Sequence, residues 1–229
     1  MPDSRILWLT DHYHPAQGGM ARSCDRIVYY LRQAGWKIDI IHFQPSRETT
    51  QLNQWENRIG GRDLACPIVF DRPYTLNLIW HLIRQSDYSH IVAFGSDTPF
   101  LAGPVYAQWL SIPLLTFLRG NDFDEGVFSK KNRNMLLDCL EKSSSIAAVS
   151  SELRDRLLSM YPEKNILFTP NGIDLNQWRA LPSHETETKT EDAIILGLVG
   201  HMKSKKGIHF LLNTILQHGL NQHLSLIHI

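Results

Sequence analysis

The sequence has few cysteines, no excess of charge of either sign and no apolar N-terminal segment. Its three cysteines, Cys24, Cys66 and Cys139, are far apart, which excludes a disulfide framework and a paired-cysteine metal motif. Basic and acidic residues balance at 23 each, so charge gives no reason to expect nucleic acid as a partner. The first residues, MPDSRILWLT, are too short an apolar run for a signal peptide. These absences favour a cytoplasmic protein with reduced cysteines.

One uncharged stretch, Thr98 to Leu118, is long enough to span a bilayer. Three prolines interrupt it, and proline is poorly tolerated inside a helix. We therefore expect a buried helix over Thr98–Leu110 and a buried strand over Pro113–Leu118, and no transmembrane segment.

The chain also lacks the GxGxxG motif and the lysine of a P-loop. It has instead the apolar run Ile6–Leu9, a polar loop, the pair Gly18 and Gly19, and apolar residues at helical spacing from Met20. This pattern predicts strand, glycine turn and helix. Such a turn lets the backbone approach a ligand, and the helix start offers unpaired N–H groups to a phosphate. A plain tight turn is the alternative.

Strands and helices alternate through the rest of the chain. Strands are expected at Lys37–Phe43, Ile68–Phe70, His90–Phe94, Ser145–Val149 and Ile166–Phe168, and helices at Leu76–Arg84, Ser129–Lys142 and Ser151–Met160. Residues 44–63 read as a loop with a short helix. Trp8, Trp36, Trp80 and Trp109 are expected in the core, and Ser150 or Ser151 as a helix cap. The alternation predicts an α/β fold, a Rossmann-like doubly wound parallel sheet with ligands at the carboxyl ends of its strands.

A composition change marks the domain boundary. Residues 179–192 lack aromatic side chains and are rich in Glu, Thr and Lys, which predicts a solvated linker. The pattern then restarts with a strand over Ala193–Val199, a basic loop over Gly200–Gly207 and a helix over Ile208–Gln217. We predict a first domain over residues 1–178 and the start of a second, incomplete Rossmann-like domain over 193–229.

Four polar loops fall at predicted strand ends: Gly18-Gly19, Gly95–Asp97, Arg119–Asp122 and Pro170–Asp174. Their order, the segments AAVSSELRDRL and FTPNGIDLNQW, and the restart at GLVGHMKSKKG resemble the family 4 glycosyltransferases of the GT-B fold. The resemblance covers nearly the whole chain. It implies transfer of a sugar from a nucleotide-diphosphate sugar to an acceptor hydroxyl, with retention at the anomeric carbon and without a metal or other cofactor. The acceptor could be a sugar or a lipid-linked molecule, which leaves peripheral membrane contact open.

The resemblance also implies roles for residues on the donor side. Gly18, Gly19 and Asn171 would lie near the donor phosphates. In the basic loop Lys206 matches the lysine that the family places on the diphosphate, whereas His201 stands where the family usually has arginine. Imidazole is a poorer phosphate ligand than guanidinium, so Lys203 and Lys205 are candidate substitutes, and a His201 protonated beside the phosphate is the alternative.

Arg119 and Asp122 follow a predicted buried strand and are the candidate catalytic residues. Arg119 would hold a phosphate or an anionic acceptor, and Asp122 would orient an acceptor hydroxyl; a structural Arg–Asp pair is the alternative. His12 and His14 form an HxH pair, but a metal site needs further converging ligands, and the sequence offers no second cluster.

The family's acidic motif, two glutamates eight residues apart, is missing because no glutamate follows Glu191. Residues 193–229 are also far fewer than the roughly 100 of a typical domain. We therefore expect this chain to be an inactive fragment. Its last six residues, 224–229, resemble the translation of a transposon end used in sequencing libraries, and we hypothesise that adapter DNA encodes them. A nucleotide-sugar epimerase of the same fold and a non-catalytic nucleotide- or sugar-binding module remain alternatives.

Overall fold

The computed structural model describes residues 5–16, 18–45, 54–68, 72–95, 97–119, 122–176, 178, 194–198, 207–219 and 224–228. The chain divides into two compact units, Met1–Gly172 and Ile173–Ile229. Within the described residues, no helix is both long and apolar enough to cross a bilayer. The uncharged stretch forms a helix, Thr98–Leu110, and then a strand, Leu114–Leu118, which confirms the prediction for this segment.

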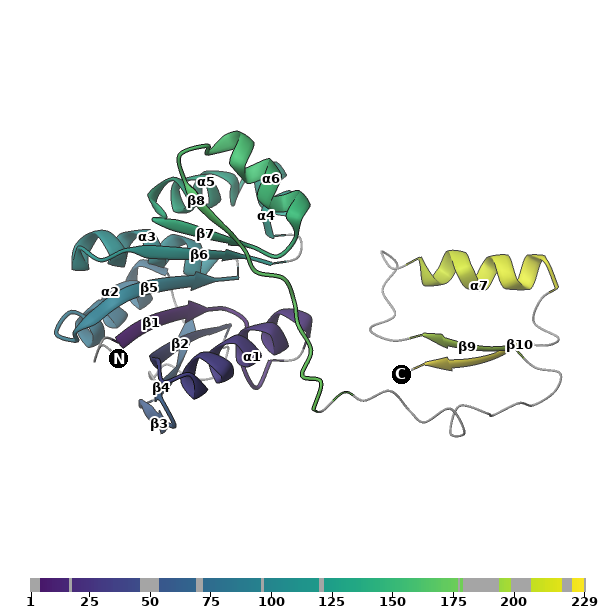
Figure 1. The fold of residues 1–229 in the computed structure, drawn as a ribbon, viewed down its shortest axis with the longest axis horizontal. Helices are drawn as coiled ribbons and strands as arrows, with labels where there is room; N and C mark the ends of the chain where they lie inside the picture. The colour runs from purple at the N-terminus through teal and green to yellow at the C-terminus, as the bar shows by residue number, and fades with distance from the viewer. Residues whose placement is uncertain are drawn as a thin grey trace. The chain divides into compact units, whose positions relative to one another are not determined.

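The first unit contains one large sheet (Figure 1). Its strands are β1 (Arg5–Thr10), β2 (Lys37–Pro45), β3 (Glu56–Arg58), β4 (Gly61–Ile68), β5 (Tyr88–Phe94), β6 (Leu114–Leu118), β7 (Ser145–Ala148) and β8 (Asn165–Phe168). They lie in the order β3-β4-β2-β1-β5-β6-β7-β8, and only β3 is antiparallel to its neighbour. The strand order reverses between β1 and β5, so the doubly wound, Rossmann-like sheet is confirmed and its switch point lies at these two strands.

Helices cover both faces of this sheet. They are α1 (Gly19–Gln33), α2 (Arg72–Ile83), α3 (Thr98–Leu110), α4 (Asp122–Phe128), α5 (Arg133–Lys142) and α6 (Ser151–Met160). Along β1, Leu7 and Leu9 join a core cluster with residues of α2 to α6, while Trp8 joins a second cluster with Cys24 and Val28 of α1. Figure 1 accordingly shows α1 on the opposite side of the sheet from α3. Burial on both faces explains why these strands are continuous apolar runs.

The segment between β2 and β5 differs from the prediction. Where a loop with a short helix and a strand at Ile68–Phe70 were expected, the described residues form β3 and β4, and β4 ends at Ile68. The β3–β4 turn depends on Gly61, because a Cβ there would lie 1.8 Å from the Ile38 carbonyl oxygen. Two of the expected core tryptophans are also exposed: Trp36 at 38% and Trp109 at 56%.

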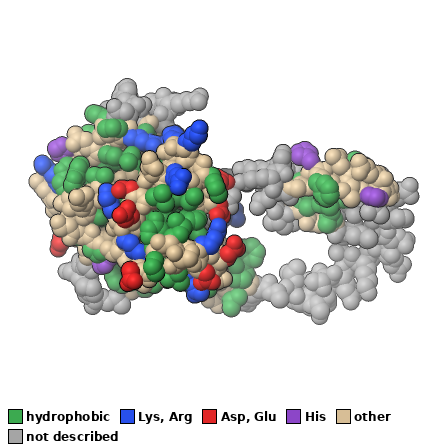
Figure 2. All heavy atoms as spheres, turned by 90° about the horizontal axis from the view of Figure 1, so that it is seen from above, with side chains coloured by type: hydrophobic (Ala, Val, Ile, Leu, Met, Phe, Trp, Pro, Cys, Tyr) green, Lys and Arg blue, Asp and Glu red, His purple; other side chains and the backbone are tan. Residues whose placement is uncertain are grey.

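In the second unit, β9 (Ile194–Leu198) and β10 (Leu224–His228) pair in parallel, and α7 (Ile208–Gln217) connects them. The strand and helix expected here are therefore present. The predicted linker, residues 179–192, lies outside the described residues. Strand β10 contains most of the segment that resembles adapter sequence. Figure 2 shows basic and acidic side chains interspersed with hydrophobic ones over one face of the first unit.

Candidate functional site

The start of α1 and the segments that follow β6 and β8 enclose a pocket of about 150 Å³, which we call the α1 pocket. Its wall is formed by the start of α1, the residue that follows β6 and the turn after β8. The lining residues are Gly19, Arg22, Ser23, Arg26, Ile27, Arg119, Pro170, Asn171 and Gly172. The α1 residues recur at three- and four-residue intervals, so they share one face of the helix. Gly19, Arg119 and Asn171, three of the predicted site residues, are thus brought together.

Arg119 is the central side chain of the α1 pocket and is only 3% exposed. Its Nη2 donates to Asn171 Oδ1 at 2.7 Å and to Ser23 Oγ at 3.0 Å, and its Nη1 donates to the Thr169 carbonyl. All three acceptors are uncharged. Among the described residues the guanidinium forms no ion pair with a carboxylate, and its Nε has no hydrogen-bond partner. Burial lowers the pKa of Arg119 from its ordinary value. The Asp122 carboxylate offsets this effect in part. A buried cation that forms no ion pair favours an anionic ligand.

The start of α1 adds to this preference. Gly18 precedes the helix and has no side chain to cap it, so a ligand can accept hydrogen bonds from the first N–H groups of α1. The Arg22 side chain is exposed and, within the part of the chain that the structure describes, makes no hydrogen bond or ion pair. Arg26 donates to the Gly172 carbonyl, which holds the turn after β8 against the helix. The helix start, Arg22 and Arg119 together form a site suited to a phosphate group.

The Asp122 side chain lies outside the α1 pocket, although it contacts the Arg119 backbone. Its Oδ2 accepts the Arg119 backbone N–H at 2.9 Å. Its side chain lines a different pocket of about 290 Å³, together with Asp97, Glu125 and Asn132. Burial raises the pKa of Asp122 to about 7. The structure therefore joins the two residues through a backbone contact, and their side chains face different pockets.

A second carboxyl group lies at the switch point, directly after β1. Burial, together with the Asp97 carboxylate, raises the pKa of Asp11 to about 8. Asp97 itself is paired with Arg72, with Nη2 and Oδ2 2.5 Å apart. No group of three or more His, Cys, Asp or Glu side chains among the described residues could hold a metal ion. The HxH pair, His12 and His14, therefore belongs to no such group within these residues.

Sequence reasoning missed Arg22, Ser23 and Arg26. The signal was present, because these residues follow the glycine turn at helical spacing. It missed Thr169 as well, and no local pattern points to that carbonyl. The predicted donor-loop residues His201, Lys203 and Lys206 lie outside the described residues.

Comparisons with known proteins bear on the family and the fold of the chain. The family model for Glycosyltransferase Family 4 matches residues 17–177, and no curated protein matches the chain. Among solved structures, sucrose-phosphate synthase from Thermosynechococcus elongatus has a TM-score of 0.69 at 13% identity, over 98% of this chain and 70% of that one. Anabaena Alr3699/HepE in complex with UDP and glucose has a TM-score of 0.63 at 13% identity, over 99% and 69%.

A third similar structure is an epimerase. UDP-GlcNAc 2-epimerase from Methanocaldococcus jannaschii has a TM-score of 0.59 at 13% identity, over 98% of this chain and 65% of that one. At these identities the structural matches show the shared GT-B fold and no specific activity. The family model, which spans more than half of the sequence, goes further: this chain belongs to glycosyltransferase family 4.

Proposed function

We propose that the chain is the acceptor-side part of a glycosyltransferase that moves a sugar from a nucleotide diphosphate to an acceptor hydroxyl, with retention at the anomeric carbon. The α1 pocket would receive the diphosphate. The observation that carries this proposal is the buried Arg119 guanidinium, which has no carboxylate partner among the described residues. Anabaena Alr3699/HepE, which shares the fold, was solved with UDP and glucose, and this supports a nucleotide sugar as the ligand.

The proposed chemistry depends on stabilising the leaving group. As the bond between the anomeric carbon and the phosphate oxygen breaks, negative charge accumulates on the diphosphate. Arg119, Arg22 and the N–H groups at the start of α1 would face that charge, and preorganised donors of this kind lower the barrier. By resemblance, Lys206, with His201 or Lys203, would complete the diphosphate contacts from the second unit. The role of Asp122 toward an acceptor hydroxyl stays a prediction.

Binding of UDP, measured by titration calorimetry, tests the anion site. Arg119→Gln and Arg22→Gln should each raise the Kd for UDP by about tenfold, since each removes a charged contact worth about 1.4 kcal/mol. Arg22 is exposed, so its variant keeps the fold even if Arg119→Gln does not. Arg156→Gln, which breaks a surface pair with Asp124 and a contact with the Phe123 ring outside the α1 pocket, is the matched control. Wild-type affinity in both pocket variants would refute the proposal.

The epimerase similarity supports a second candidate activity, interconversion of a nucleotide sugar without an acceptor. Product analysis separates the two, because a transferase releases nucleoside diphosphate as the acceptor is glycosylated, whereas an epimerase yields a second nucleotide sugar. No glutamate follows Glu191, and we propose that the 229-residue chain alone binds the donor without transferring its sugar. Turnover by the purified chain would contradict that part of the proposal.

A further inference from the structure

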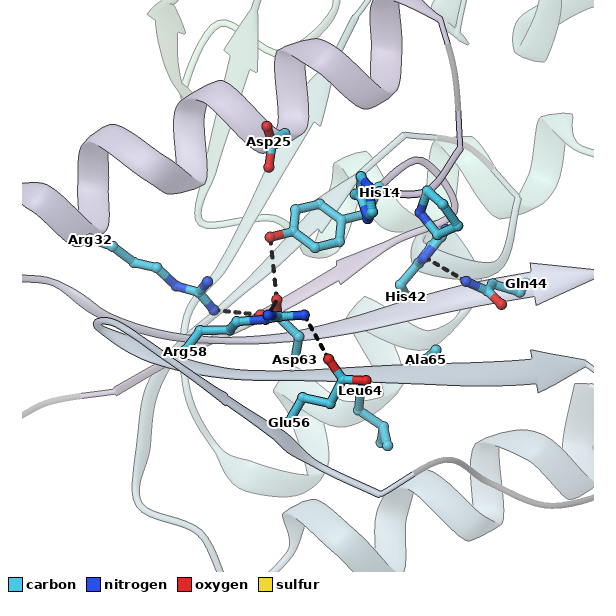
Figure 3. Close-up of a pocket in the computed structure, with 12 residues that line it drawn as sticks. His14, Asp25, Arg32, His42, Gln44, Glu56, Arg58, Asp63, Leu64 and Ala65 are labelled. Carbon is cyan, nitrogen blue, oxygen red and sulfur yellow. Dashed lines mark hydrogen bonds and ion pairs between the residues drawn. The ribbon is translucent and has the colours of Figure 1, made fainter.

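A third and larger cavity, of about 480 Å³, lies on the α1 face of the sheet beside β2 and β4. We call it the β2–β4 cavity. Figure 3 shows its residues converging from α1, the β1–α1 loop, β2 and the β3–β4 hairpin. The floor of the cavity is formed by strands β2 and β4. His42 and Ala65 are partners in the parallel β2–β4 register, and both line the cavity. Its volume falls within the roughly 300–1,000 Å³ typical of small-molecule sites.

The charged groups of this cavity are largely balanced against one another. Arg32 Nη2 lies 2.7 Å from Asp63 Oδ1, and Arg58 lies 2.6 Å from Glu56 and 3.2 Å from Asp63. Both lining guanidinium groups are therefore already paired with lining carboxylates. Asp25 adds a further carboxylate, which is exposed and forms no ion pair with any described residue. A cavity with paired cations and one further negative charge disfavours an anion, in contrast to the α1 pocket.

The uncharged groups of the cavity are suited to hydroxyl groups. Gln44 Nε2 lies 3.1 Å from His42 Nδ1, which holds the imidazole in place. Burial lowers the pKa of His42, so its ring stays neutral near pH 7. The Tyr13 ring packs edge-on against His42, with centroids 6.1 Å apart, and its hydroxyl donates to Asp63 at 3.4 Å. Fixed donors and acceptors beside an aromatic ring can bind the hydroxyls and the apolar face of a sugar.

The β2–β4 cavity and the α1 pocket share two elements. The β1–α1 loop contributes Tyr13 to the cavity and leads into Gly19 of the α1 pocket. Helix α1 turns Asp25 and Arg32, seven residues apart, toward the cavity, and turns Arg22 and Arg26 toward the pocket. The two sites therefore flank the first turns of one helix.

We propose that the β2–β4 cavity binds an uncharged sugar ring, as the acceptor of the transfer reaction. This inference rests on the proposed function, because it assigns the acceptor class for the donor site at the α1 pocket. The proposal excludes an acceptor that places a phosphate or a uronic acid in the β2–β4 cavity. The cavity favours a neutral ring because its cations are already paired and its uncharged groups can hydrogen-bond to hydroxyls.

Saturation-transfer NMR titrations of methyl glucoside, galactoside and mannoside, with glucuronic acid as the anionic probe, test the inference. At least one neutral glycoside should bind the wild-type chain with a Kd of about 1–10 mM, and glucuronic acid should bind more weakly. Ala65→Met fills the cavity from β4 and should weaken that binding at least about fivefold. Ala34→Met, at an exposed position after α1, is the matched control and should bind like wild type.

Titration of UDP into the same proteins separates the two proposals. If UDP binds to wild type and to Ala65→Met but no neutral glycoside binds, the acceptor inference is wrong and the donor site stands. If a glycoside binds and Ala65→Met weakens it while UDP does not bind, the proposed donor function is wrong instead. Tighter binding of glucuronic acid than of every neutral glycoside would also overturn the acceptor class.

Discussion

A Cβ atom built on Gly95 would lie 3.2 Å from Cδ2 of His12. Gly95 follows β5 and His12 follows β1, so this close approach joins the two strands that flank the switch point. Gly95 also has a φ of +108°, a conformation that side chains with a Cβ rarely adopt. Both steric observations require glycine at this position.

We therefore predict that Gly95→Ala destabilises the first unit by about 1–3 kcal/mol, through backbone strain and the contact with His12. Thermal melts followed by circular dichroism would measure this as a lower Tm. Gly172→Ala is a suitable control, because a Cβ there meets no atom within 4 Å and its φ lies outside the left-handed region. Equal melting of Gly95→Ala and wild type would contradict the steric argument.

Gly19→Val should separate binding from folding. A Cβ on Gly19 meets nothing within 4 Å, and the φ of Gly19 lies outside the left-handed region. The free energy of unfolding of the variant should therefore lie within about 1 kcal/mol of the wild-type value. The side chain would, however, enter the α1 pocket where the backbone must approach a phosphate. We expect at least about a tenfold rise in the Kd for UDP, with Gly19→Ala intermediate. Unchanged UDP binding by the valine variant would show that the turn is only structural.

Ser150 caps α6, as the sequence predicted for this pair of serines. Its Oγ accepts the Leu153 backbone N–H at 3.2 Å. Ser150→Ala should lower the free energy of unfolding by about 1 kcal/mol. The neighbouring Ser151→Ala is the matched control, because in the described structure its side chain forms no cap hydrogen bond, and urea unfolding curves would compare the two. A loss confined to Ser151→Ala would reverse the assignment.

Local sequence patterns predicted the fold where each element has its own signature. Helices α3 and α6 have the predicted bounds. Strand β4 was misread because its start carries Arg62 and Asp63, whose charges are neutralised by distant partners, Asp39 and Arg32. Trp109 was assigned to the core because α3 is apolar around its whole circumference, so no polar stripe identifies its exposed face.

The candidate site was also predicted only where its residues belong to a local sequence pattern. The glycine turn and the PNGID segment have local signatures, which located Gly19 and Asn171. The contacts of Arg119 with Ser23 and Asn171 span 96 and 52 residues. Such contacts depend on the order of the strands in the sheet, because that order decides which loops are neighbours at the carboxyl edge. A single sequence does not reveal the strand order. The separation of the Arg119 and Asp122 side chains into different pockets was hidden for the same reason.

Asp11 should make stability depend on pH. In the unfolded chain an aspartate titrates near pH ~3.9, whereas burial and then Asp97 raise the folded pKa of Asp11 to about 8. Between these values the unfolded state releases a proton that the folded state retains. The contribution of Asp11 to stability is therefore greatest below the unfolded pKa, falls as pH rises toward 8, and is constant above that.

Asp11→Asn removes this titration while keeping the size of the side chain. Relative to wild type, the variant should gain stability steadily from pH 5 to pH 8.5, by about 1–3 kcal/mol at the upper end. Urea unfolding at several pH values measures the difference directly, and other titrating groups cancel in the comparison. Asp138→Asn, at an exposed carboxylate paired with Lys142, is the matched control. A constant difference between Asp11→Asn and wild type across this range would mean that Asp11 is already ionised in the folded protein at pH 5.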